Sequence, residues 1–163
     1  MRTYLGVDGG GSKTSFLLID ETGKVLASHT EGPAYYLEIG LEELRAMLGR
    51  GIRTTLARAR VSPANLTFAF LGLPAYGEDS RLVPVLNAIA SPELPSERYR
   101  CGNDMVCGWA GALAGEDGIN VVAGTGSLLQ NSRRRAGHHP ASPLRSPGGR
   151  APSPKLEPPP LTK

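Results

Sequence analysis

The sequence predicts an α/β fold in which a mixed five-strand sheet is flanked by helices. Three observations support this prediction. Short strand-like runs joined by tight turns open the chain, strand-like and helical segments then alternate, and the pattern ends near residue 130. An opening meander pairs antiparallel and later strand–helix alternation pairs parallel, so the sheet should be mixed. The 163 residues are enough for one domain of ordinary size.

Short strands are expected at residues 4–8, 14–20 and 25–29. Each is rich in residues that suit a sheet, and glycine-rich or polar turns at residues 9–12 and 21–24 separate them. Strands joined by such short turns pair antiparallel, so this segment should form a meander.

Helical and strand-like segments follow from residue 41 onward. Residues 41–60 carry apolar side chains at three- and four-residue steps, which predicts an amphipathic helix weakened by Gly49 and Gly51. The apolar run at residues 66–73 predicts a strand that is buried on both faces. A second helix is expected at residues 80–90.

The last periodic segments are a short strand at residues 98–101, a helix at residues 105–114 and a buried strand at residues 119–123. A sharp turn follows at residues 124–127. Each strand that precedes a polar turn is a place where functional side chains can gather.

The chain is expected to divide into a folded lobe at residues 1–130 and a tail at residues 131–163. Residues 132–163 hold 8 of the 14 prolines and carry 7 Lys/Arg against 1 Asp/Glu, whereas residues 1–131 carry 11 against 14. The tail lacks the apolar surface needed to offset its ordering entropy, so we expect it to be a disordered Arg/Pro-rich tail. Its basic residues would give only salt-sensitive contacts, and we expect no specific nucleic-acid partner.

The cysteines and the apolar runs favour a cytoplasmic enzyme. Cys101 and Cys107 lie six residues apart, which is neither a redox pair nor a zinc spacing. A polar loop interrupts the first apolar run by residue 9, so the segment does not resemble a signal peptide and we expect none. The longest apolar stretch, residues 66–75, is far shorter than the ~20 residues that span a bilayer, so we expect no membrane partner.

A carboxylate and a glycine-rich turn follow the first strand. Asp8 ends that strand, and the turn comprises Gly9, Gly10, Gly11, Ser12, Lys13 and Thr14. Glycines let backbone N–H groups approach phosphate oxygens, the lysine and hydroxyls could also meet phosphate, and Asp8 could hold Mg²⁺ through water. The pattern is neither a Walker A loop nor a dinucleotide-binding fingerprint, and a plain glycine-rich hairpin is the alternative.

Two later segments carry related chemistry. A second glycine–hydroxyl turn follows a buried strand and comprises Gly124, Thr125, Gly126 and Ser127. Asp104 follows a short strand and precedes a helix. A carboxylate placed there could accept a proton from a sugar hydroxyl, or it could only cap the helix.

Three motifs in this order, GVDGGGSKT at residues 6–14, GNDMVCGWAGAL at 102–113 and VVAGTGSL at 121–128, resemble the N-acetylglucosamine kinase and BadF/BadG/BcrA/BcrD-type ATPase family. The resemblance covers about residues 3–129. It implies an RNase H-like lobe of the actin/hexokinase type, one of two lobes that hold ATP and a sugar in the cleft between them.

The resemblance also implies roles for the motif residues. Asp8 would be the metal-associated carboxylate, Gly9 to Thr14 the first phosphate loop, Asp104 the catalytic base and Gly124 to Ser127 the second phosphate loop. The implied cofactors are ATP and Mg²⁺, and the partner is a small-molecule sugar contacted by Asp104 and the adjacent Asn103. For full-length members, the resemblance is also compatible with a homodimer.

The chain departs from the family in two respects. Members that phosphorylate N-acetylglucosamine read Gly-Pro-x-x-Asn after the third strand, whereas this chain has Tyr36 at the Asn position. Tyr36 could stack on a sugar face or pack within a loop. Members are also roughly twice as long, as expected for two lobes, and the Gly-Gly-Trp-Gly and Gly-Asp-Glu-Gly stretches expected after the second phosphate loop are absent.

We therefore predict an ATP-dependent sugar kinase, similar to N-acetylglucosamine or glucosamine kinases, that lacks its adenine-binding lobe and is inactive as written. The alternatives are a non-catalytic fragment and a dehydratase-activating ATPase, for which two cysteines are too few to bind an iron–sulfur cluster. We also hypothesise that residues from Leu128 onward are an out-of-frame reading of the kinase gene. Arg, Pro, Ala, Gly and Ser dominate there, as in GC-rich DNA read in the wrong frame.

Overall fold

The chain begins with an antiparallel meander. A computed structural model describes residues 1–113, 118–122 and 128–132, with side-chain surroundings as far as residue 111. Strands β1 (Thr3–Gly9), β2 (Thr14–Asp20) and β3 (Val25–Glu31) come first. β1 pairs antiparallel with β2, and β2 with β3, which confirms the predicted meander.

Two further strands extend the sheet on the other side of β1. β4 (Phe68–Leu73) pairs parallel with β1, and β5 (Tyr99–Asn103) pairs parallel with β4. The strand order is β3-β2-β1-β4-β5. The mixed five-strand sheet is therefore confirmed, and its three parallel strands end at one common edge.

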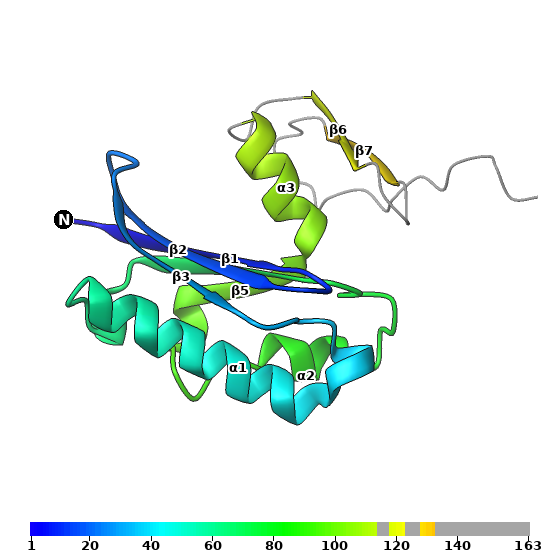
Figure 1. The fold of residues 1–163 in the computed structure, drawn as a ribbon, viewed down its shortest axis with the longest axis horizontal. Helices are drawn as coiled ribbons and strands as arrows, with labels where there is room; N and C mark the ends of the chain where they lie inside the picture. Colours follow the sequence, from blue (N-terminus) through cyan, green and yellow to red (C-terminus); the bar gives the residue numbers. More distant parts are fainter. Residues whose placement is uncertain (114–117, 123–127, 133–163) are drawn as a thin grey trace, which may run out of the picture.

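Helices lie on both faces of the sheet. The helices α1 (Tyr36–Arg58) and α2 (Val83–Asn87) lie on one face, and α3 (Asp104–Leu113) projects from the other (Figure 1). Short 3₁₀ turns at Pro63–Asn65 and Ser96–Arg98 lead into β4 and β5. No helix in the described part of the chain is long and apolar enough to cross a membrane.

Two predicted helices differ in extent from the observed ones. α1 begins before residue 41, but Gly40 has φ 80° and ψ 161°, a conformation that separates a first turn from the main helix. The helix expected at residues 80–90 contracts to α2. Pro84 has no N–H, and the amides of Ile89 and Ser91 bond only three residues back, to Leu86 and Ala88, so the chain continues as turns.

A separate two-stranded sheet follows α3. β6 (Gly118–Val122) pairs antiparallel with β7 (Leu128–Ser132), and both strands contact α3. β6 agrees closely with the strand expected at residues 119–123. β7 has no counterpart among the predicted strands, and it runs past the domain boundary expected at residue 130.

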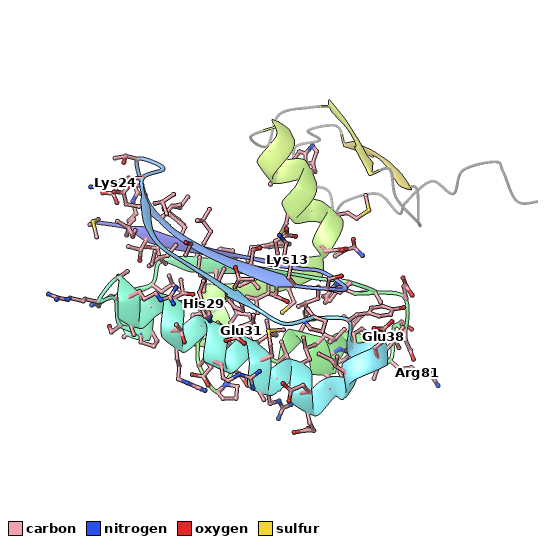
Figure 2. All side chains as sticks on the ribbon, in the orientation of Figure 1. Lys13, Lys24, His29, Glu31, Glu38 and Arg81 are labelled. Atoms are coloured by element: carbon pink, nitrogen blue, oxygen red, sulfur yellow. The ribbon has the colours of Figure 1, made fainter. Side chains whose placement is uncertain are left out.

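The core lies between α1 and the sheet. In β1 the buried residues alternate with more exposed ones, so one strand face packs inward. The largest fully buried side chains are Phe16, Leu5, Leu18, Leu44, Met47, Leu48, Ile52, Leu66, Leu71, Leu73, Leu86 and Ile89. Arg50 of α1 forms ion pairs with Glu31 and Glu43 at the edge of this layer. Glu31, labelled in Figure 2, ends β3.

Candidate functional site

The parallel strands bring the two principal candidate carboxylates to one edge of the sheet. Asp8 is the second-last residue of β1, and Asp104 follows β5 directly as the first residue of α3. Between them lies β4, in which Gly72 pairs with Asp8 on one side and with Gly102 on the other. The carboxyl ends of parallel strands are where α/β proteins gather functional side chains.

Electrostatics link the two carboxylates. Burial raises the pKa of Asp104, and repulsion from Asp8 and Glu78 adds to the increase, while hydrogen bonds from backbone amides oppose it. Partial desolvation likewise raises the pKa of Asp8, although Asp8 is open to solvent, and the Lys13 ammonium opposes that increase. At this edge of the sheet the charge of Asp8 therefore acts on Asp104, and the charge of Lys13 acts on Asp8.

The glycine-rich turn is shaped by close backbone packing. A Cβ at Gly9 would lie 2.7 Å from the Gly72 carbonyl oxygen and 2.9 Å from the Ala34 Cβ, so only glycine fits there. The Gly10 amide donates to the Lys13 carbonyl at 3.0 Å and closes the turn. Gly11 has open space where a side chain would stand, so its backbone is free to approach a ligand.

The turn exposes some predicted phosphate-binding residues and buries another. Ser12 and Lys13 are exposed, and Lys13 lies on the side of the sheet from which α3 projects (Figure 2). Thr14, in contrast, is fully buried, and its hydroxyl donates to the Gly32 carbonyl at 2.8 Å. In this conformation Thr14 therefore secures the turn to the loop after β3 and has no hydroxyl proton left for a phosphate.

The predicted sugar-contacting residues also have structural partners. Tyr36 is only 5% exposed, and its hydroxyl donates to the Ala75 carbonyl at 3.4 Å, which favours packing within a loop over stacking on a sugar. The side-chain oxygens of Asn103 and Asp104 both accept from the Met105 amide at 3.0 Å. α3 begins at Asp104, so Asn103 stands at the N-cap position and makes the cap bond, while Asp104 is the first helical residue. The second carboxylate oxygen of Asp104 is not used by the bond to Met105.

Sequence reasoning missed Glu78. This residue lies in the turns after β4, and its charge raises the pKa of both Asp104 and Tyr36. Glu78 therefore lies near the candidate base and near Tyr36, the first residue of α1. The available signal was its position in a polar segment directly after a parallel strand, the same signal that identified Asp8 and Asp104.

The described residues suit a magnesium–phosphate ligand better than a metal held by protein alone. Within residues 1–113, no three His, Cys, Asp or Glu side chains come together to hold an ion. Mg²⁺ is usually held by one or two carboxylates together with water and substrate phosphates, which fits Asp8 beside an open glycine turn. The predicted second phosphate loop, Gly124, Thr125, Gly126 and Ser127, lies outside the described residues.

Comparisons with known proteins agree with this architecture. The profile of the BadF/BadG/BcrA/BcrD ATPase family matches residues 5–137. An N-acetyl-D-glucosamine kinase from Dictyostelium discoideum is 26% identical over 133 residues, covering 77% of this chain and 42% of that protein.

Two solved structures, each named "Putative N-acetylglucosamine Kinase", have the same fold. The one from Chromobacterium violaceum has a TM-score of 0.61 at 25% identity and covers 80% of this chain and 45% of its own. The one from Porphyromonas gingivalis has a TM-score of 0.63 at 18% identity and covers 88% and 47%. The chain thus spans less than half the length of these relatives. The family match extends past Leu128, the residue from which an out-of-frame reading is hypothesised.

Proposed function

Because the chain belongs to the BadF/BadG/BcrA/BcrD ATPase family, we propose that it is the phosphate-binding and base-carrying lobe of an ATP-dependent sugar kinase. The substrate class is an N-acetylglucosamine- or glucosamine-like sugar, and the setting is the cytoplasm. The observation that supports this most directly is the placement of Asp8, the open glycine turn and Asp104 at one sheet edge.

Asp104 acts as the general base in this proposal. Its carboxylate accepts the proton of a sugar hydroxyl while the hydroxyl oxygen bonds to the γ-phosphorus of ATP. The bond from that phosphorus to the β–γ bridging oxygen breaks, and ADP leaves with the electron pair. A raised pKa makes the ionised Asp104 a stronger proton acceptor than an ordinary aspartate.

The remaining groups bind and orient the phosphates. Gly11, Ser12 and Lys13 are exposed at the turn and offer backbone N–H groups, a hydroxyl and a cation for phosphate oxygens. Asp8 would hold Mg²⁺, which neutralises phosphate charge when it is bound. Positioning of this kind can account for roughly 7–11 kcal/mol of barrier lowering.

The dehydratase-activator alternative needs cysteines that ligate a cluster as thiolates. Burial raises the pKa of Cys101 to about 12 and that of Cys107 to about 11, and the Cys107 thiol donates to a backbone carbonyl. In this lobe both thiols are partly buried and protonated, and two cysteines are too few to bind an iron–sulfur cluster. The kinase proposal makes no use of them as nucleophiles.

The first test is binding. Mg·ATP added to the 163-residue chain should shift the amide resonances of residues 8–14 in an NMR titration, and a sugar should then shift those of residues 103–105. Spectra unchanged by millimolar Mg·ATP would refute the nucleotide site. Binding without turnover would support the alternative of a non-catalytic fragment.

The second test is catalysis. ADP release is measured over a panel of hexoses and aminosugars. We expect turnover far below the enzyme median of about 10 per second, because the chain spans less than half the length of its relatives. In a full-length close relative, the change that corresponds to Asp104→Asn should preserve the fold and sugar binding while lowering kcat by at least ~100-fold. An unchanged kcat would show that Asp104 only helps to cap the helix.

A further inference from the structure

α3 approaches β4 so closely at one point that no side chain fits between them. A Cβ at Gly72 would lie 2.6 Å from the Cys107 Sγ and 3.1 Å from the Asp104 Cα. Carbon atoms in ordinary contact are about 3.5–4.0 Å apart. Gly72 is therefore the point on β4 where the first turn of α3 rests, and it is the residue that pairs with Asp8.

A second contact ties the same turn of α3 to β1. The Cys107 thiol donates to the Val7 carbonyl oxygen with a sulfur–oxygen distance of 3.3 Å, across 100 positions of sequence. Val7 immediately precedes Asp8, and Cys107 lies three residues after Asp104, on the same side of the helix. Because burial raises the pKa of Cys107 to about 11, the thiol keeps the proton that it donates.

We propose that Gly72 and Cys107 are positioning residues that together set where Asp104 stands relative to Asp8. Gly72 lets α3 rest on β4, and the Cys107 thiol holds the same turn against the strand that carries Asp8. The catalytic consequence rests on the proposed function, whereas the geometric part does not. Misplacing a reacting group by about 1 Å can cost ~100-fold in rate, so this contact matters to a base.

The test compares four variants of the 163-residue chain. Cys107→Ala removes the thiol donor, Cys107→Ser restores an O–H donor, and Gly72→Ala fills the space under α3. Cys101→Ala is the matched control, because Cys101 is also a partly buried free thiol but packs against the main core. Amide chemical shifts of Asp104 and Met105 report the position of the first turn, and ADP release with a responsive sugar reports kcat and KM.

We expect the two amides to shift in Cys107→Ala and Gly72→Ala, and to stay near wild type in Cys107→Ser and Cys101→Ala. In Cys107→Ala, kcat should fall by about 10- to 100-fold with KM for sugar and ATP within about twofold, and Cys107→Ser should recover most of the loss. A merely structural cysteine would give no such separation of kcat from KM.

Each other outcome is decisive. Unmoved amides in Cys107→Ala, or an unchanged kcat in that variant of an active chain, overturn the inference. If the amides move as expected while the wild-type chain releases no ADP, the positioning contact stands. The kinase proposal is then decided by the Mg·ATP and sugar titrations, and it fails if neither ligand shifts the site resonances. If Gly72→Ala does not fold, the Cys107→Ala and Cys107→Ser pair still decides.

Discussion

Two glycines of α1, Gly49 and Gly51, should respond in opposite ways to the same substitution. A Cβ at Gly51 would lie 2.5 Å from two carbons of the Phe16 ring and closer still to its Cζ. Phe16 is 1% exposed and cannot move away without displacing β2 from the helix. At Gly49 the nearest atoms are Glu93 Oε1 at 3.0 Å and Arg53 Nη1 at 3.2 Å, the ends of flexible side chains.

The magnitudes follow from these surroundings. Alanine gains up to about 1 kcal/mol over glycine in a helix interior, while forcing extra volume into a packed core costs typically 1–3 kcal/mol and occasionally more. Because the ring at Gly51 is so close, we expect Gly51→Ala to lower the free energy of unfolding by about 1–2 kcal/mol net. Gly49→Ala should change it by between about zero and +1 kcal/mol, since the partly exposed Arg53–Glu93 pair that it disturbs contributes little.

Urea unfolding followed by circular dichroism measures both variants against wild type under identical conditions. Equal slopes with separated midpoints would show that stability, and not the denatured state, has changed. If Gly51→Ala proves as stable as wild type, or if Gly49→Ala is the more destabilised of the two, then α1 and Phe16 are not in contact as close as the structure indicates.

Two further predictions concern the site. The folded protein binds the Asp104 proton more tightly than the unfolded chain, so this residue's contribution to stability is lost as pH rises from the ordinary aspartate pKa through the raised one. Asp104→Asn should therefore raise the free energy of unfolding at pH 7 and flatten its dependence on pH in urea titrations at pH 4, 5.5 and 7, and lower stability at pH 7 would contradict this. Thr14→Val should lower the free energy of unfolding by about 1–3 kcal/mol, because it leaves the Gly32 carbonyl unpaired, and it should have little effect on ATP affinity. Ser12→Ala should instead weaken ATP binding without loss of stability. The reverse pattern would assign the phosphate contact to Thr14.

Much of the fold could be predicted from sequence because its signals are local. Alternating apolar residues and short turns predict the β1–β3 meander, and the apolar run before Pro74 predicts β4. Parallel strands end at a common edge by geometry alone, so the positions of Asp8 and Asp104 at the ends of their strands were enough to predict that they lie at the same edge. Composition and period therefore determined the architecture of the sheet and the edge where the candidate site lies.

The tertiary structure decided how individual side chains are used there. Thr14 bonds to Gly32, Tyr36 is buried against the loop that carries Ala75, and Cys107 bonds to Val7. These partners lie 18, 39 and 100 positions away in sequence, and no periodicity within a segment encodes which distant carbonyl a hydroxyl or thiol will reach. The same reason applies to Gly51. The sequence marks it only as a residue that weakens a helix, and only the packing of Phe16 against it shows that no larger side chain fits there.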